Sequence, residues 1–409
     1  MSVALVACLV GPWGMLAVWW VRSSVPGQKV NAELLGGLPV SDRGVIRGKP
    51  GPWGQLECST VFTELPTNGG NTDTLPPNRW AFGKATREAA LTVLRKAGVT
   101  PTQLQTLARS EAWKADPDGV LWLHPSADSV LSLTAEVRAS LYSALEQIGA
   151  NRPLRKRYAC AVDRVDEWCR DSGLPEQYVR LFRHLLYRRD GYYVFEDLSS
   201  ALSTIPSPQL QRLFVRMVTR QESIMANLVV LPSSDVEQIS AYWEVGRQSK
   251  GLKELLRALR RLPGGGKVDV THLLPPLARD LMHAVPHDSA PTSTSARADA
   301  SGTWTSLNFF LAVPDQRFLD PILASKELQS KYTPLERPKR LGDLIVFMDA
   351  NNNIVHMATY LAQDLVFSRV GDASGYCWVI TTLDSLVGRF QVEHSPLRFR
   401  VAFSRSLQL

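Results

Sequence analysis

A histidine in a short apolar segment near the end of the chain, His356, has the clearest chemical potential in this sequence. It stands in "IVHMATYLA", residues 354–362, directly after "LGDLIVFMDANNN". Strand alternation puts His356 on one face with Ala358 and Tyr360. An imidazole held on a strand can act as a general base, and a nucleophile would then be expected upstream. Packing is the alternative role for this side chain.

The other reactive side chains show no spacing that predicts a metal site or a phosphate loop. The seven histidines form no HExxH pattern, and the five cysteines contain no CxxC pair. In "RRLPGGGKVDV", residues 260–270, Val268 stands where a phosphate loop needs serine or threonine, so these glycines predict the end of a helix. We therefore predict no cofactor, no metal and reduced structural cysteines.

Two predicted elements would position His356. In the first, "RLGDLIVFMD" forms a strand, "NNN" at 351–353 tolerates left-handed turn geometry, and the histidine strand returns as the second arm of a hairpin. The second is a helix in "SGTWTSLNFFLAV", residues 301–313. Its apolar side chains share one face, as expected of a packed helix: Trp304, Leu307, Phe310 and Leu311.

This combination resembles the NlpC-type papain-fold peptidase superfamily. The matching segments are "GDL" at 342–344, an apolar strand, a loop, and "HMATYL" at 356–361. The corresponding family motif is G-D-[LV], an apolar strand, and then H-[VA]-[GA]-[IL]-Y-[LI]. In that family a cysteine near the start of an upstream helix is the nucleophile, the strand histidine is its base, and a polar residue on the next strand orients the ring. The resemblance covers roughly a quarter of the chain. It implies a papain-like α+β domain with an antiparallel sheet.

The resemblance also implies positions for the other two groups, and here the chain departs from the family. The matching helix has no cysteine. Alignment through Phe309-Phe310 places Ser306 at the nucleophile position, and an alternative register places Gly302 there. The orienting position falls twelve residues after His356, at Ser368. Serine is a weaker nucleophile than cysteine at neutral pH and needs stronger activation.

Two neighbouring residues bear on catalysis. Arg369 follows Ser368, and its guanidinium would oppose an imidazolium nearby. Cys377, in "SGYCWVITTL", follows His356 in the chain, so it cannot take the nucleophile's place in the family's order of residues.

The amino terminus predicts a membrane anchor. Residues 3–21, "VALVACLVGPWGMLAVWWV", are nineteen residues without a charge, about the length that crosses a hydrocarbon core. A secretory signal and a lipoprotein signal ending before Cys8 are alternatives, and both lack a basic start. Arg22 and Lys29 follow the run, so the positive-inside tendency predicts a single-pass membrane protein with its bulk on the cytoplasmic side.

The order of predicted helices, strands and linkers along the chain indicates an α+β multidomain protein. A helix over 86–98 begins at a threonine cap, and a strand at 54–65 precedes it. The predicted parts follow in chain order: transmembrane anchor 1–21, tether 22–53, small α+β domain 54–149, largely helical domain 150–285, flexible linker 286–301, and papain-like domain 302–409.

Two functional hypotheses remain. The chain is 44% hydrophobic and 21% charged, with a net charge of +7 that is spread along it, so no specific nucleic acid is expected. The first hypothesis is a membrane-anchored binding or scaffold protein with an inactive papain-like domain and a protein or peptide ligand. The alternative is an active amide hydrolase or acyl transferase that uses Ser306 and His356.

Overall fold

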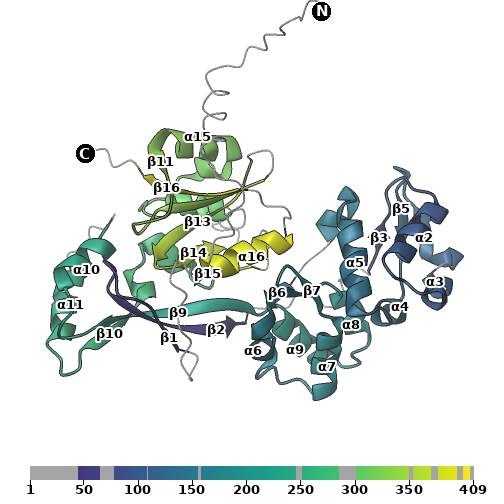
Figure 1. Ribbon diagram of the computed structural model, residues 1–409, viewed down its shortest axis with the longest axis horizontal. Coiled ribbons are helices and arrows are strands. Elements are labelled where there is room, and N and C mark those ends of the chain that lie inside the picture. Colours follow the sequence, from purple (N-terminus) through teal and green to yellow (C-terminus); the bar gives the residue numbers. More distant parts are fainter. Residues whose placement is uncertain are drawn as a thin grey trace, which may run out of the picture. The chain divides into compact units, whose positions relative to one another are not determined.

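The protein is an α+β chain built around antiparallel sheets (Figure 1). The structure, a computed structural model, describes residues 45–64, 78–107, 109–154, 158–245, 251–284, 301–349, 353–369, 376–393 and 399–405. Within these ranges no helix combines the length and apolar composition that a membrane crossing requires. The predicted anchor, 3–21, lies outside the described residues. So does the predicted linker, apart from its last residue, Ser301.

A four-stranded sheet joins segments that are far apart in the chain. Its order is β1 (Val45–Arg47), β2 (Gln55–Thr63), β9 (Gln221–Val230) and β10 (Gly266–Asp269). β2 and β9 pair over their length, from Gln55 opposite Val229 to Thr63 opposite Gln221. The predicted strand at 54–65 is thus confirmed, while β1 occupies the end of the predicted tether.

Three helices follow the long strand β9. They are α10 (Val236–Trp243), α11 (Leu252–Arg260) and, after β10, the short α12 (Pro276–Leu281). α10 and α11 lie against each other, and α11 contacts β9 and β10 (Figure 1). α11 ends before Gly264 and Gly265, both at positive φ, so the glycine run stops a helix as predicted.

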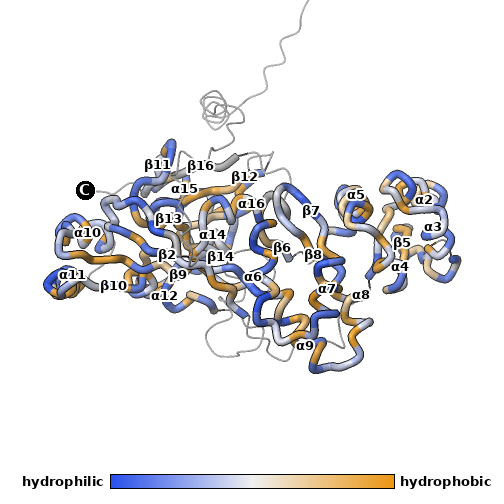
Figure 2. Tube along the Cα trace, turned by 60° about the horizontal axis from the view of Figure 1, so that its bottom comes forward, coloured by the Kyte–Doolittle hydropathy of each residue, from blue (hydrophilic) through white to orange (hydrophobic). Residues whose placement is uncertain are grey.

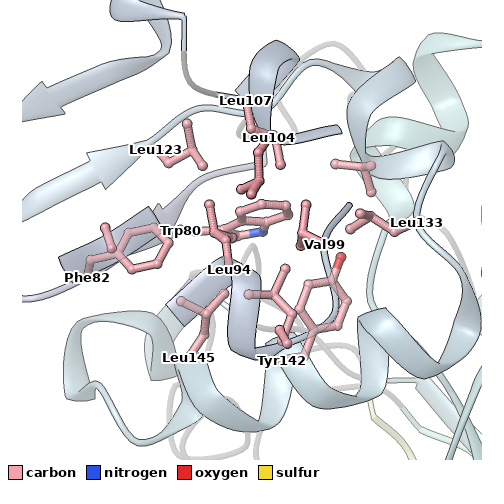
Figure 3. Close-up of a cluster of buried hydrophobic side chains, with 14 of the residues drawn as sticks. Trp80, Phe82, Leu94, Val99, Leu104, Leu107, Leu123, Leu133, Tyr142 and Leu145 are labelled. Atoms are coloured by element: carbon pink, nitrogen blue, oxygen red, sulfur yellow. The ribbon is translucent and has the colours of Figure 1, made fainter. Parts of the chain in front are cut away.

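Residues between β2 and β9 form two units of the same design. In the first, β3 (Trp80–Ala81) is followed by α2 (Arg87–Lys96), α3 (Pro101–Leu107), β4 (Trp113–Ala115) and β5 (Leu121–Leu123). The predicted helix at 86–98 is confirmed by α2, whose Thr86 cap accepts a hydrogen bond from Ala89 N. Figure 3 shows the core of this first unit, in which Trp80 lies among leucine side chains and Tyr142.

The second unit repeats this path after α4 (Ala127–Leu131) and α5 (Ala135–Glu146). Its elements are β6 (Tyr158–Ala161), α6 (Val165–Cys169), α7 (Glu176–Leu185), β7 (Tyr187–Arg189) and β8 (Tyr192–Phe195). The sheets have matching orders, β3-β5-β4 and β6-β8-β7. Each unit therefore follows the strand, helix, helix and hairpin path of a winged helix-turn-helix.

The prediction of a largely helical middle needs correction. Within 150–285, α8 (Leu198–Ser203) and α9 (Pro208–Val218) join the helices named above, but β6, β7, β8, β9 and β10 also lie there. The sequence did not predict these strands because most of them are only three or four residues long, which is too short to show an alternation of apolar and polar residues. In addition, β9 mixes buried polar residues such as Gln221 and Ser223 with apolar ones.

The carboxyl-terminal segment forms a six-stranded antiparallel sheet. Its order is β11 (Tyr332–Leu335), β16 (Phe399–Arg405), β12 (Leu344–Met348), β13 (Ile354–Ala362), β14 (Leu365–Arg369) and β15 (Trp378–Thr382). The helices of this segment are α14 (Gly302–Asn308), α15 (Pro321–Lys331) and α16 (Leu383–Glu393). α14 packs on β13, and α16 contacts β15.

The predicted hairpin of β12 and β13 is confirmed, and its entry explains the Gly-Asp pair. Gly342 has a φ of +90°, which favours glycine. Asp343 Oδ2 accepts hydrogen bonds from Lys339 N at 2.7 Å and Arg340 N at 2.9 Å. This pair therefore shapes the turn into β12, which sets the register that places His356 opposite Phe347.

Candidate functional site

His356 lies at the centre of the carboxyl-terminal sheet. It is on β13 and only 2% exposed. Its ring stacks on Phe390 of α16, with 4.2 Å between ring centroids, and lies 5.8 Å from the ring of Phe347. Aromatic rings thus cover the imidazole, which limits the access of water and of any substrate.

A hydrogen bond with Ser368 helps to orient the imidazole. His356 Nε2 lies 2.7 Å from Ser368 Oγ on β14. The Ser368 hydroxyl is placed to donate to Arg369 O at 3.1 Å, an arrangement in which its oxygen accepts from Nε2–H. We infer that Nε2 carries the proton of the neutral ring. Nδ1 is then the basic nitrogen.

The basic edge of the ring faces the first residue of α14. A Cβ atom built on Gly302 would lie 2.7 Å from His356 Nδ1, 2.6 Å from Met357 O and closer still to His356 Cε1. Real Cβ atoms do not approach that closely. Gly302 therefore occupies the place beside the base, where it offers no nucleophilic atom and where a side chain has no room.

Ser306 lies one helical turn farther along α14. It is 4% exposed, and no hydrogen bond joins it to His356 among the residues that the structure describes. The cap of this helix is Ser301, whose Oγ accepts from Trp304 N. The structure thus brings together His356, Ser368 and Gly302, and leaves Ser306 outside that group.

The arginine next to Ser368 does not reach the imidazole side. Successive strand residues point to opposite faces, so Arg369 and Ser368 diverge. Arg369 lies over the Trp378 ring, 5.4 Å from its centroid, and its Nε donates to Tyr376 O. The expected opposition between this guanidinium and an imidazolium is consequently weak.

Cys377 is held in a structural contact. Its backbone N donates to Gln221 Oε1 at 3.0 Å, and its Sγ lies 3.1 Å from the same atom. Burial raises the pKa of the Cys377 thiol to about 12, so the thiolate is scarce at neutral pH. This side chain cannot serve as a nucleophile in that state.

Two residues of this region, Phe390 and Gln221, were missed by sequence reasoning. Phe390 stacks on the histidine from a helix that follows β15, and Gln221 comes from β9 in another sheet. Neither position carries a local signal, because the contact depends on how distant segments pack.

The described residues hold no group of three or more His, Cys, Asp or Glu side chains suited to a metal ion. Neither the models of known protein families nor the curated proteins gave a match to this chain.

Proposed function

We propose that the chain is a membrane-anchored binding or scaffold protein whose carboxyl-terminal domain keeps a papain-like shape without catalysis. The anchor is residues 3–21, the bulk lies on the cytoplasmic side, and the ligand is a protein or peptide. Support for the papain-like shape comes from the helix before the antiparallel sheet, the histidine on β13 and its polar partner on β14.

The single observation that carries the inactive state is Gly302 at the basic edge of His356. Nucleophilic hydrolysis needs an oxygen or sulfur atom within hydrogen-bond reach of the base. Here the adjacent position has no side chain, and Met357 O and the imidazole occupy the space that one would need. The enclosed ring then serves packing and orientation within the sheet.

The test compares hydrolysis of amide and ester probes by the wild type with two histidine variants. His356→Ala removes the buried ring, and His272→Ala, at an exposed histidine, is the matched control. A third variant, Ser306→Ala, removes the alternative nucleophile. We expect no turnover above background in any of the four proteins. Turnover that disappears in both His356→Ala and Ser306→Ala, but persists in His272→Ala, would overturn the proposal in favour of the Ser306 hydrolase.

A further inference from the structure

The small sheet of the first winged unit is covered by helices on one face. α2 and α3 lie beside β5, as Figure 2 shows, and their leucines pack with Trp80 and Leu123. Successive strand residues point to opposite faces, so Trp122 and its cross-strand neighbours Ala81 and Lys114 lie on the other face. Ala81 is buried there, but Trp122 is half-buried and Lys114 is exposed. The β4–β5 part of this second face is therefore open to solvent.

In the second winged unit the corresponding face is closed. Phe195 packs with the core side chains of α6 and α7, so Val194 and its partner Tyr187 point away from those helices. Both are buried, and the Tyr187 ring meets Tyr142 of α5 at 5.7 Å between centroids. The two units thus share a path but use this face differently, for apolar packing in the second unit and for polar side chains in the first.

Three basic side chains surround Trp122 on the open face. The Arg79 guanidinium lies over the indole, 4.7 Å from its centroid, and Lys114 is the direct cross-strand neighbour of Trp122. His124 follows two residues after Trp122. Burial lowers the pKa of His124, and the charges of Lys114 and Arg79 lower this pKa further. The two cations therefore lie close enough to act on the same imidazole.

These cations have no acidic partner of their own. Neither Arg79 nor Lys114 forms an ion pair with any residue that the structure describes. The carboxylate of Asp116 is engaged in the β4–β5 turn, where it accepts hydrogen bonds from Trp122 Nε1 at 2.9 Å and Val120 N at 2.8 Å. It holds the indole in place and leaves the group with a net positive charge. An anion placed among these cations would relieve their mutual repulsion.

We propose that this surface, the wing face of Arg79, Lys114, Trp122 and His124, binds the phosphoryl group of a phosphorylated peptide. A guanidinium offers a fork of donors that matches phosphate oxygens, and the lysine adds a compact charge. Because the ring of Trp122 supports the guanidinium, fewer rotamers are lost on binding. The proposal rests on the binding function proposed above, whose ligand is a protein or peptide, and it names the chemical class of that ligand.

A phosphopeptide fits this surface better than a nucleic acid. The cations of the wing face gather around a single ring, and the neighbouring helix α3 contains no charged residue. A nucleic-acid backbone is held by basic groups that follow a row of phosphates. A compact cluster with no continuation onto the helix matches one isolated phosphoryl group.

The test uses the full chain in a non-ionic detergent and two fluorescent peptide libraries of randomised sequence. The libraries are identical except for a central residue, which is phosphoserine in one and serine in the other. Fluorescence anisotropy gives the affinity for each. We expect the phosphoserine library to bind about tenfold more tightly, because the phosphoryl group adds charge-assisted hydrogen bonds. Equal affinity for the two libraries overturns the proposal.

Two double variants locate the effect. Arg79→Ala with Lys114→Ala should abolish the preference for phosphoserine. The control, Arg95→Ala with Lys96→Ala, removes the same charge from an exposed basic pair in the last turn of α2 and should keep the preference. An equal loss in both double variants would mean that net charge alone attracts the phosphopeptides, and it overturns the proposal.

Two further readouts separate this proposal from its alternatives. A single-stranded DNA is titrated in parallel. Loss of DNA binding in the Arg79→Ala, Lys114→Ala protein, without any preference for phosphoserine in the wild type, would assign the wing face to nucleic acid. Peptide binding without that preference contradicts the wing face alone, because the proposed function requires only a peptide ligand. Turnover of the amide and ester probes contradicts the inactive carboxyl-terminal domain alone, because His356 lies in a different sheet.

Discussion

At the scale of single residues, the candidate site is defined by what stands beside one imidazole. The Ser368 hydroxyl fixes the ring through Nε2, and the opposite edge meets Gly302. Sequence resemblance located the histidine and the serine because they lie within one continuous hairpin region. It left two registers open for the nucleophile position, since α14 is separated from β13 in the chain and only their packing sets which residue faces the ring.

Adding a side chain at Gly302 should destabilise the fold. We expect Gly302→Ala to lower the free energy of unfolding by about 1–3 kcal/mol, because the new methyl group would press on Met357 O and His356. Gly149→Ala is the control: Gly149 has no neighbour within 4 Å of a built Cβ, and this change should be neutral or slightly stabilising. Urea unfolding measures both. Equal effects would show that the space beside His356 is not closed.

Asp364 should make stability depend on pH. It lies in the β13–β14 turn, and its buried Oδ1 has no hydrogen-bond partner among the described residues. Burial raises the pKa of this carboxyl from 3.8 to about 6. The folded state then binds more protons than the unfolded state between these values, so the stabilisation is complete below pH 3.8 and is lost as pH rises to 6.

Replacing this carboxyl tests the sign. From pH 4 to 7 the wild type should lose on the order of 2 kcal/mol relative to Asp364→Asn, whose amide does not titrate. Asp118→Asn, at an exposed turn position, should follow the wild type across the range. Urea midpoints at several pH values give the comparison. Parallel curves for the wild type and Asp364→Asn would contradict the assignment.

At the scale of elements, α16 links the candidate site to the second winged unit. Phe390 stacks on His356, while Arg389, the residue before it, reaches Ala159 O of β6. Gly388 lies against Tyr192 of β8 so closely that a Cβ there would meet the phenol ring. The strand that carries His356 and the strands of the second winged unit thus contact the same helix, α16. The absence of a side chain at 388 permits the contact with Tyr192.

A double-mutant cycle measures this contact. Gly388→Ala alone should cost about 1–3 kcal/mol of unfolding free energy, because the methyl group overlaps Tyr192. In a Tyr192→Ala background the same change should cost close to nothing, which gives a coupling of at least about 1 kcal/mol. Urea unfolding of the four proteins provides the values. Additive effects would mean that α16 and β8 do not touch in solution.

The second helices of the winged units also bear on partners. α3 contains no charged residue. On α7, Arg180 pairs with Glu176 at 3.7 Å and Arg183 pairs with Asp166 at 2.7 Å. These acidic neighbours interrupt the basic face that phosphate contacts would need. The expectation of no specific nucleic acid therefore stays a prediction, and the winged path alone does not change it.

At the scale of the whole molecule, predictability follows distance along the chain. The helix begun by Thr86, the strand β2 and the hairpin of β12 and β13 were predicted because capping, alternation and turn residues act over a few positions. The pairing of β2 with β9 and the contact of Gln221 with Cys377 were not. They join residues more than a hundred positions apart, and no local pattern records them.

Because β2 pairs with β9 in antiparallel fashion, residues 64–220 form a long insertion between the two arms of one hairpin. Thr63 lies opposite Gln221, so both winged units leave and return at neighbouring positions. Replacing 64–220 with Asn-Gly should let the two strands connect through a tight turn. We expect cooperative urea unfolding at lower stability, because α16 loses Tyr192 and Ala159. Omitting Thr63 as well gives the control, since a one-residue slip reverses the faces of β2. If only the chain that keeps Thr63 unfolds cooperatively, the four-stranded sheet is stable without the two winged units. If neither chain unfolds cooperatively, the winged units are needed to stabilise that sheet.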